Sequence, residues 1–399
     1  MKRWPTAALG EIAGGGQYGL NAPAMSEGTG VRFVRITDIT QAGELRHEEP
    51  AFVPEDTPEL DDYELKDGDV LIARSGATAG KSYIHHSFGE RAVFAGYLIR
   101  FQPDTSKILP RFIGAFLQTP AYWQQLNSHK RAVAQPNVNA KQLASLVLPM
   151  PPLVEQERIV KLLDEADELR KLRTRADRRT AALIPALFHD MFVRADFVEK
   201  TIGQFLEQGW LLLHKDGNHG SLYPRSSDFG IEGIPFLSAT CVTNEGTIDH
   251  SEVKRLAEEK AKLLRHGWIE CGDVLLAHNA SVGAVGFYGG DYDRAIIGTS
   301  LTAFRANVDR IEPRFLWASL RDIFFQDQLE RIMKQALRNQ VPITAQRELF
   351  LRIPALALQK EFASRVAKIR AMEVQQLISR QKLDALFQSL LHRAFRGEL

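Results

Sequence analysis

The residues with the clearest potential for chemistry are the glycines, hydroxyl groups and lysine of residues 75–82, which read SGATAGKS. A phosphate-binding loop of the GxxxxGK[ST] type holds phosphates with its backbone N–H groups and its lysine. Here Gly76 stands one residue too close to Gly80, and the corresponding stretch in the second half of the chain, NASVGAVG, has no lysine. A glycine-rich hairpin tip is the better interpretation, because glycine accepts positive φ and allows close approach. A nucleotide-dependent enzyme built on residues 75–82 is kept as an alternative hypothesis.

Two histidines, His214 and His219, lie in the polar segment HKDGNHGSLYPRSSDFG at residues 214–230. Their spacing is poor for a metal ion and no carboxylate or thiol cluster accompanies them, so we expect no metal site. The corresponding segment of the first half, GGGQYGLNAP at residues 14–23, is also rich in glycine with Gln, Tyr and Asn. Either these are ordinary solvated loops, or they are recognition loops whose different side chains suit different targets. Cys241 and Cys271 have no CxxC spacing and are interpreted as reduced, buried thiols.

Two further segments combine basic and amide side chains, HKRAVAQPN at residues 129–137 and KQALRNQVP at residues 334–342. Lys and Arg contact phosphates or guanine, and Asn and Gln pair with adenine, so both segments are candidates for DNA contact. Charged loops without that role are the alternative. The run RKLRTRADRR at residues 170–179 holds six basic residues and one acid, and it could follow a phosphate backbone or meet an acidic partner.

Motifs of catalysis are missing from the sequence. We find no [DN]PP[YF] methyltransferase signature, no FxGxG pattern for a methyl donor, no GxSxG and no HExxH. The net charge of +1 excludes the overall basicity of a nonspecific nucleic-acid binder. No apolar run reaches 18 residues and no apolar core follows the basic start MKRWP, so we expect neither a transmembrane helix nor a secretory signal, and a cytoplasmic protein.

The elements that position these segments occur twice, about 203 residues apart. GDVLIA at residues 68–73 returns as GDVLLA at residues 272–277, PRF at 110 returns at 313, and FVRIT at 33 faces FLSAT at 236. LPMPPLVEQERIV, from residue 148, answers LRIPALALQKEFA, from residue 351. A period of about 200 residues is too long for a solenoid, so a whole domain with its following segment has been duplicated.

Each repeat begins with about 150 residues of short β-branched runs broken by Gly, Asp and Pro, as strands between turns are. A helical stretch that begins at a proline follows, at residues 110–126 and 313–333. Apolar residues at a three-to-four spacing then predict a long helix, from about residue 155 to 193 and from about residue 362 onward. These helices pack either against each other, antiparallel, or each on its own globular domain. Pro185 should kink or break the first helix.

We therefore predict an α+β fold. Two duplicated mixed α/β domains, at residues 1–150 and 196–353, are joined by helical regions at residues 151–195 and 354–399. The two helical regions are expected to form an antiparallel coiled coil with pseudo-two-fold symmetry.

The chain resembles the specificity subunits of type I restriction-modification systems over essentially its whole length. The resemblance rests on the two GDVLxA strands with their turns, on the LPxPPLxEQxxIV entry to the first long helix, and on the closing LDALFQSLLHRAFRGEL. It implies two target-recognition domains, each reading one half of a split DNA site, and paired helices that set the gap. It also implies that this subunit is not catalytic and that it docks two modification subunits, which carry the adenine methyltransferase activity. Motor-nuclease subunits would join the complex for restriction.

No cofactor is expected in this chain, since the resemblance puts S-adenosylmethionine and ATP with Mg²⁺ on the partner subunits. The second copy departs from the first, so a role for Lys81 does not transfer to Val285. Ala355, Ala357 and Lys360 replace Pro152, Val154 and Glu157, so the two docking surfaces are not expected to be identical.

The candidate DNA contacts are polar side chains of the segments described above: Tyr18, Asn21, Arg74, Ser75, Thr78, Lys81, Arg131 and Gln135 in the first half, and His214, Lys215, Asn218, His219, Arg225, Asn279, Ser281, Arg338 and Gln340 in the second. The candidate docking residues lie on the long helices: Gln156, Ile159, Leu163, Arg170, Gln359, Phe362, Val366 and Arg370. A coiled-coil adaptor whose mixed domains bind protein is the alternative, favoured by the weak charge of each segment.

Overall fold

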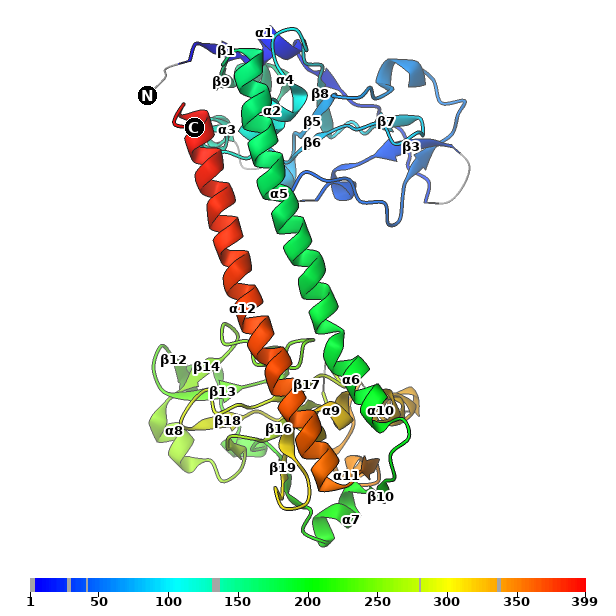
Figure 1. Cartoon of the computed structure of the whole chain (residues 1–399), viewed down its shortest axis with the longest axis vertical. Coiled ribbons are helices and arrows are strands. Elements are labelled where there is room, and N and C mark those ends of the chain that lie inside the picture. The colour runs from blue at the N-terminus through cyan, green and yellow to red at the C-terminus, as the bar shows by residue number, and fades with distance from the viewer. Residues whose placement is uncertain (1–3, 27–29, 41, 131–136, 280, 336–338) are drawn as a thin grey trace. The chain divides into compact units, whose positions relative to one another are not determined.

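The computed structural model describes residues 4–26, 30–40, 42–130, 137–279, 281–335 and 339–399. The chain divides into two compact units. Unit 1 comprises Met1–Arg173 and Ser379–Leu399, and unit 2 comprises Thr174–Ile378 (Figure 1). Each unit is described by itself.

Unit 1 has a four-stranded antiparallel sheet and a three-stranded sheet. The first has the order β2 (Gln17–Tyr18), β8 (Leu98–Phe101), β5 (Val70–Ala73), β6 (Ser82–Ile84). The second has the order β4 (Phe52–Val53), β3 (Val31–Val34), β7 (Ala92–Phe94), with β3 parallel to β7. β1 (Thr6–Ala8) pairs with β9 (Val147–Pro149). The helices are α1 (Leu9–Ala13), α2 (Pro110–Phe116), α3 (Pro120–Lys130) and α4 (Ala140–Ala144), with short 3₁₀ turns η1 (Ile36–Asp38), η2 (Leu60–Tyr63) and η3 (Gly76–Thr78).

Unit 2 repeats this plan. Its four-stranded sheet has the order β11 (Leu211–Asp216), β19 (Leu301–Ala306), β16 (Val274–Ala277), β17 (Val285–Phe287). Its second sheet has the order β12 (Phe229–Gly230), β14 (Lys254–Leu256), β13 (Ile234–Leu237), β18 (Ala295–Ile297), β15 (Trp268–Ile269), and β10 (Val198–Thr201) pairs with β20 (Phe350–Ile353). The helices are α7 (Ile202–Glu207), α8 (Glu258–Leu263), α9 (Pro313–Arg321), α10 (Ile323–Gln335) and α11 (Ile343–Gln346), with η4 (Gly220–Leu222), η5 (Ser226–Asp228) and η6 (Ala239–Cys241).

The repeated GDVLxA sequence becomes a tight turn and a central strand in both units. All four residues of β5 and of β16 are buried, which is why both strands are continuously apolar. Asp69 caps the preceding turn by accepting from the Lys66 N–H, and Asp273 does so from the Glu270 N–H. Both carboxylates are buried and paired with an arginine of the neighbouring strand, Asp69 with Arg100 and Asp273 with Arg305. The repeated GDVLxA motif therefore encodes the same capped turn, buried strand and Asp–Arg pair in both units.

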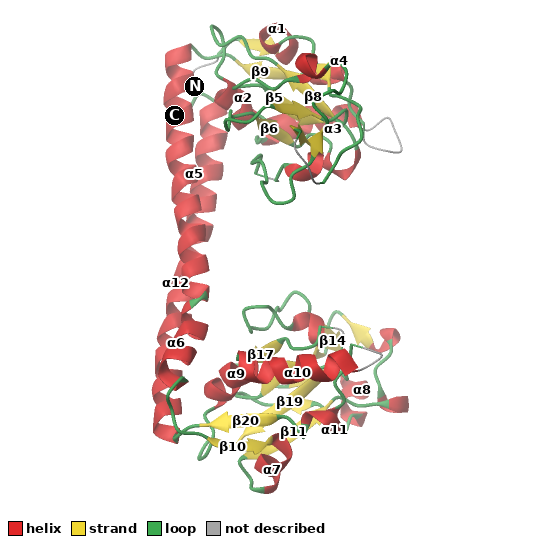
Figure 2. Ribbon diagram, turned by 90° about the vertical axis from the view of Figure 1, so that its right-hand side faces the viewer, coloured by secondary structure: helices red, strands yellow, loops and turns green. Residues whose placement is uncertain are grey.

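The helical stretches predicted at residues 110–126 and 313–333 are each two helices, which corrects the prediction. In unit 1, α2 ends before Leu117 and Pro120 begins α3, because proline suits the first helical position. In unit 2, α9 ends at Arg321 and α10 begins at Ile323. Figure 2 shows α9 and α10 against the four-stranded sheet, and α9 contacts β16, β17 and β19.

The long helices are α5 (Leu153–Ala181), α6 (Leu183–Phe192) and α12 (Leu356–Phe395), and the division between the units falls within α5 and α12. The break between α5 and α6 confirms the effect predicted for Pro185. Proline has no N–H to donate to the carbonyl of residue 181, and its ring clashes with that carbonyl, so the helix stops one turn before Pro185.

Within each unit, each long helix packs both against the other long helix and against the globular part, so both packing alternatives hold. In unit 1, Leu163 of α5 shares a core cluster with Leu391 of α12 and with Phe112 of the globular part, and Arg170 meets Asp384 at 2.7 Å. In unit 2, Thr180 accepts from Gln376 at 2.8 Å, and Phe188 of α6 lies against Phe362 and Phe315. Residue numbers rise on one helix as they fall on the other, so the helices run antiparallel within each unit (Figures 1 and 2).

Candidate nucleic-acid interface

The hairpin that follows the central strand is held beside the basic and amide-rich segment in both units. In unit 1, Ser75 forms a β-bridge with Asn137, and the Val138 N–H donates to the Arg74 carbonyl at 2.8 Å. In unit 2, Asn279 forms the corresponding bridge with Gln340. The Val341 N–H again donates to the residue before the bridge, His278, at 2.9 Å. The same backbone contact thus joins the hairpin to a distant segment in both units, and in unit 2 it places the candidates Asn279 and Gln340 side by side.

Residues 74–81 form a hairpin between the antiparallel strands β5 and β6, as predicted. Gly76 has a φ of 71° and opens the three-residue turn η3, in which the Thr78 hydroxyl donates to the Ser75 carbonyl. Gly80 has a φ of 99°, and a Cβ there would lie 2.1 Å from a methyl carbon of Leu126, so only glycine lets the hairpin reach α3. Strand β6 follows this loop, whereas a nucleotide-binding loop leads into a helix that presents its N-terminus to phosphates.

Arg74 and Tyr18 form a stacked pair at this hairpin. The guanidinium carbon lies 4.8 Å from the centre of the Tyr18 ring, and the Tyr18 hydroxyl accepts from the Ala140 N–H at 3.1 Å. The Arg74 Nε is buried and has no hydrogen-bond partner among the described residues. Stacking on a fixed ring restricts the guanidinium plane, which is a favourable starting point for directional hydrogen bonds to a base or a phosphate.

The remaining candidates of unit 1 differ in exposure. Asn21 is exposed, and Lys81 is half-buried. Burial lowers the pKa of Lys81, and the nearby charge of Arg46 lowers it further. Arg131 and Gln135 lie outside the described residues.

Most candidates of unit 2 are accessible. Gln340 is half-buried, and Arg338 lies outside the described residues. His219 is exposed, with its Nε2 2.6 Å from a carboxylate oxygen of Asp216. The other exposed candidates are Lys215, Arg225, Asn279 and Ser281.

Two candidates of unit 2 are corrected by the structure. Asn218 is buried, and its amide is used internally: it donates to the His266 carbonyl and accepts from the Arg265 and His266 N–H groups. His214 is only 5% exposed and packs on Phe304, with its Nε2 3.1 Å from Gln346. Burial lowers the pKa of His214 to about 4, so the ring is neutral and cannot supply charge to a phosphate.

The docking prediction also needs correction. Ile159, Leu163, Phe362 and Val366 are core residues of their own units, so a partner cannot contact them directly. Gln156 and Gln359 are fully buried. Each glutamine lies in the first turn of its long helix and binds three backbone groups. These six side chains therefore hold the chain together instead of forming an external surface.

Arg170 and Arg370 are partly exposed but engaged within their units. Arg170 pairs with Asp167 and Asp384 and lies over the Phe387 ring. Arg370 pairs with Glu373 and lies over the Trp317 ring. An acidic partner was one of the two possibilities for the basic run, and for Arg170 such partners lie inside the chain itself.

Apolar side chains of the long helices that we expected to pack remain exposed within their units. Leu172 is 48% exposed and Met372 is 46% exposed. The same holds for Leu169 and Leu386 in unit 1, and for Leu183 and Leu377 in unit 2. Val374 and Ile378 of unit 2, which were not part of the predicted stripe, are exposed as well. The sequence signal that could have identified them is the width of the apolar stripe on each helix, which exceeds the strip that one partner helix can cover. They offer a contact surface that the buried docking candidates do not.

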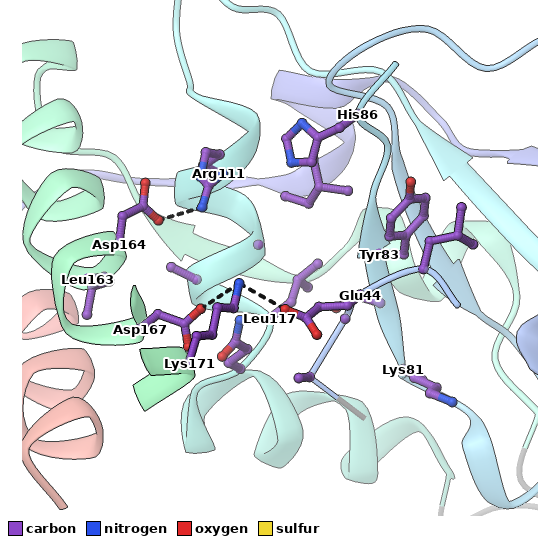
Figure 3. A pocket seen from close by; sticks show the side chains of 18 of the residues that line it. Glu44, Lys81, Tyr83, His86, Arg111, Leu117, Leu163, Asp164, Asp167 and Lys171 are labelled. Atoms are coloured by element: carbon purple, nitrogen blue, oxygen red, sulfur yellow. Dashed lines mark hydrogen bonds and ion pairs between the residues drawn. The ribbon is translucent and has the colours of Figure 1, made fainter. Parts of the chain in front are cut away.

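A groove of about 860 Å³ lies in unit 1 between the long helices, α2 and the hairpin (Figure 3). Lys171 of α5 spans it and binds Glu44 at 2.9 Å and Asp167 at 3.1 Å, and Arg111 binds Asp164 at 2.6 Å. The hydrogen bond to Glu44 is the main reason that the pKa of Lys171 is raised. Lys171 joins the basic run to the globular part of the unit, a connection that its sequence did not indicate.

Of the two thiols predicted to be buried, Cys241 is buried and Cys271 is exposed, which corrects the prediction for Cys271. No group of three or more His, Cys, Asp or Glu residues in the described part of the chain is arranged to hold a metal ion. Along the same residues, no helix combines the length and the apolar character needed to cross a membrane.

Comparison with known proteins finds one family over the first part of the chain. Residues 1–177 match the model of the type I restriction modification DNA specificity domain. The chain is related to the specificity subunits of type I restriction-modification systems, which confirms the resemblance predicted from the sequence.

Two curated relatives illustrate the extent of the similarity. The chain is 22% identical to the type I restriction enzyme EcoBI specificity subunit of Escherichia coli, over 93% of this chain and 80% of that subunit. It is 24% identical to the putative type I restriction enzyme MjaX specificity subunit of Methanocaldococcus jannaschii, over 92% of this chain and 86% of the relative.

Solved structures share the fold, with mixed helix and strand content. One is a chain from a structure that describes complex assembly and conformational transition of the type I R-M system. The match has a TM-score of 0.63 at 18% identity and covers 100% of this chain and 99% of that chain. Another is the S subunit of the type I system of M. genitalium, with a TM-score of 0.55 at 13% identity over 98% of this chain and 96% of the subunit.

Proposed function

We propose that this chain is the DNA-reading subunit of a type I restriction-modification complex, in which unit 1 reads one half and unit 2 the other half of a bipartite, asymmetric site. The observation that carries the proposal is the doubled bridge, Ser75 with Asn137 and Asn279 with Gln340. One backbone framework presents different side chains in the two units. Such an arrangement suits two readers of unlike half-sites.

The side chains around each bridge have the chemistry that base and phosphate contacts need. Asn279 and Gln340 can pair with adenine, and the stacked Arg74 can donate to guanine or to a phosphate. Exposed Lys215 and Arg225 suit phosphates, which position a protein without reading sequence.

We assign modification-subunit docking to the exposed apolar side chains of the long helices, represented by Leu172 and Met372. Two modification subunits, with a pseudo-two-fold relation between the repeats, are the expected arrangement. On this proposal the chain itself is not catalytic. Adenine methylation with S-adenosylmethionine belongs to the modification subunits, and ATP with Mg²⁺ to motor-nuclease subunits.

The paired helices would set the gap between the half-sites, since a helix is a stiff connector with a fixed rise per residue. The coiled-coil pairing of α5 and α12 over their full length is part of this proposal. Adding or removing one helical turn in both helices should change the gap and leave both half-sites unaltered.

The test is to coexpress the chain with the modification subunit encoded beside it and to map methylated adenines by long-read sequencing. A split motif that disappears when the chain is omitted supports the proposal. No motif, with both proteins soluble and associated, would contradict it and would favour an adaptor that binds protein.

A further inference from the structure

The same turn of the chain faces the long helix in both units. In unit 1 the Gly43 N–H donates to the Thr40 carbonyl, and in unit 2 the Gly246 N–H donates to the Thr243 carbonyl, with a φ of 78° at both glycines. We call these the Thr40 turn, comprising residues 40 and 42–44, and the Thr243 turn, comprising residues 243–247. Each turn lies in the globular part of its unit, which shares a buried core with the long helices, and side chains of the helices add contacts to the turn itself.

In unit 2 the Thr243 turn is held by three side chains on three successive carbonyls. Arg321 donates to the Asn244 carbonyl at 2.8 Å, Arg370 to the Glu245 carbonyl at 3.0 Å, and Trp317 to the Gly246 carbonyl at 3.1 Å. The guanidinium groups of Arg321 and Arg370 lie 5.0 and 5.1 Å from the Trp317 ring. The hollow that remains there is only about 200 Å³.

In unit 1 the corresponding positions are occupied by Gly114, Gln118 and Asp167, by the alignment of PRFIGAFLQ with PRFLWASLR and of Gln156 with Gln359. Gly114 cannot be enlarged without displacement, since a Cβ there would lie 2.4 Å from a methyl carbon of Ile84. The indole that fills the space in unit 2 is thus replaced by the open groove of Figure 3.

The Thr40 turn is instead connected to α5 by Lys171, which binds Glu44 across the groove and Asp167 one turn earlier on its own helix. The Lys171 side chain is 45% exposed and that of Glu44 is 52% exposed. Exposed ion pairs of this kind are weak and are screened when salt is raised, whereas the buried Trp317 hydrogen bond and the arginine hydrogen bonds to uncharged carbonyls are screened much less.

We infer that Lys171 is a positioning residue that holds the recognition part of unit 1 against its long helix through Glu44. Because this bridge is weak, the recognition part of unit 1 can shift on its helix. The recognition part of unit 2 is held more rigidly by Trp317, Arg321 and Arg370. This inference rests on the proposed function, because it concerns how strictly the gap between two half-sites is measured. A recognition part that shifts against its helix accepts gaps one base pair longer or shorter than the preferred gap. The tolerance should therefore depend on Lys171 and on ionic strength.

The experiment uses the complex of the full chain with its modification subunit. After the half-sites have been mapped, methyl transfer is measured on duplexes with the native gap and with gaps one base pair shorter and longer, at low and at raised salt. The readout is the ratio of off-gap to native-gap methylation, which cancels the general loss of DNA affinity that salt causes.

Lys171→Met breaks the ion pair from the side of the helix, and Glu44→Gln breaks it from the side of the turn. Each should raise the ratio at low salt by about two- to fivefold, the range that an exposed ion pair supports, and should make the ratio nearly independent of salt. Lys171→Arg should restore the wild-type profile. Arg370→Met should have a smaller effect, because Trp317 and Arg321 still hold the Thr243 turn. Lys161→Met, at an exposed position of the same helix, is the matched control and should change nothing.

Wild-type ratios in both Lys171→Met and Glu44→Gln would overturn the inference. A change in Lys171→Met alone would also overturn it, because Lys171 would then act on DNA directly and not through Glu44. If the wild-type complex methylates no split site at all, the proposed function itself fails, which is a different outcome from an unchanged ratio.

Discussion

Gln156 and Gln359 occupy the same position in the two units and make the same three hydrogen bonds. The Gln156 Oε1 accepts from the Leu109 N–H at 2.9 Å, and its Nε2 donates to the carbonyls of Lys107 and Pro151. The Gln359 Oε1 accepts from the Glu312 N–H at 2.8 Å, and its Nε2 donates to the carbonyls of Arg310 and Pro354. Each glutamine thus joins the first turn of a long helix to the segment before α2 or α9.

Replacement of either glutamine by leucine should be strongly destabilising. Leucine leaves one buried N–H and two carbonyls without this partner, and each unsatisfied buried group costs about 1–3 kcal/mol. We expect a loss of about 3 kcal/mol or more in the free energy of unfolding, measured by denaturant titration of the full chain. Gln124→Leu, at an exposed position of α3, is the control and should change the free energy by less than about 0.5 kcal/mol. An equally small change for Gln156→Leu would contradict the account of this contact.

The buried ring of His214 should make unit 2 sensitive to acid. Its pKa is lowered from 6.5 to about 4 by burial, against a smaller raising effect of the Gln346 hydrogen bond. Because the folded pKa lies below the unfolded value, the stability is fully present above pH about 6.5 and is lost as the pH falls towards 4. At about 1.4 kcal/mol per pH unit, this single group accounts for a loss of about 3 kcal/mol.

The measurement is the free energy of unfolding at a series of pH values, for the wild type and for His214→Gln, which stays neutral. The variant should lose a large part of the acid sensitivity between pH 6.5 and 4. Burial also lowers the pKa of His278, so a smaller sensitivity should remain. Identical pH profiles for the two proteins would show that His214 is not held neutral by the fold.

The two hairpins should control separate half-sites. Arg74→Ala removes the stacked guanidinium of unit 1, and Asn279→Ala removes the amide next to the bridge of unit 2. A good bidentate base contact is worth about 1–3 kcal/mol of discrimination, so each variant should relax one half-site by about tenfold or more and leave the other intact. Methylation mapping with each variant measures this directly. Relaxation of both half-sites by one substitution would contradict independent reading.

The exposed apolar side chains of the long helices should matter for assembly and not for folding. Leu172→Glu and Met372→Glu place a charge on surfaces that are about half exposed in the free chain. We expect an unchanged unfolding midpoint but an affinity for the modification subunit that is weaker by about tenfold or more. Copurification and titration with the modification subunit test this. Full affinity in both variants would place docking elsewhere.

The parts of the structure that were predictable are those in which local sequence fixes the outcome. GDVLIA and GDVLLA specify a capped turn and a buried strand by themselves, and Pro185 breaks its helix through its own missing N–H. The duplication was visible because such local signals recur in order. The two helical stretches were predicted too long because their breaks, after Phe116 and at Asp322, interrupt an otherwise continuous apolar spacing.

The site was less predictable because burial of a polar side chain depends on distant partners. Asn218 looks like a recognition residue in a glycine-rich segment, yet its partners are backbone groups nearly 50 residues away. Gln156 and Gln359 look like exposed helical residues, but carbonyls of an earlier loop enclose them. Gly114 and Trp317 follow the same PRF motif and give an open groove in one unit and a filled one in the other.

The most direct test of the central claim is adenine-methylation mapping in cells that carry the modification subunit with and without this chain, followed by Arg74→Ala and Asn279→Ala. We predict a split motif that requires the chain, with only its first half relaxed by one variant and only its second half by the other. A motif that is the same with and without the chain, or no motif although the two proteins associate, would contradict the claim that this chain reads DNA.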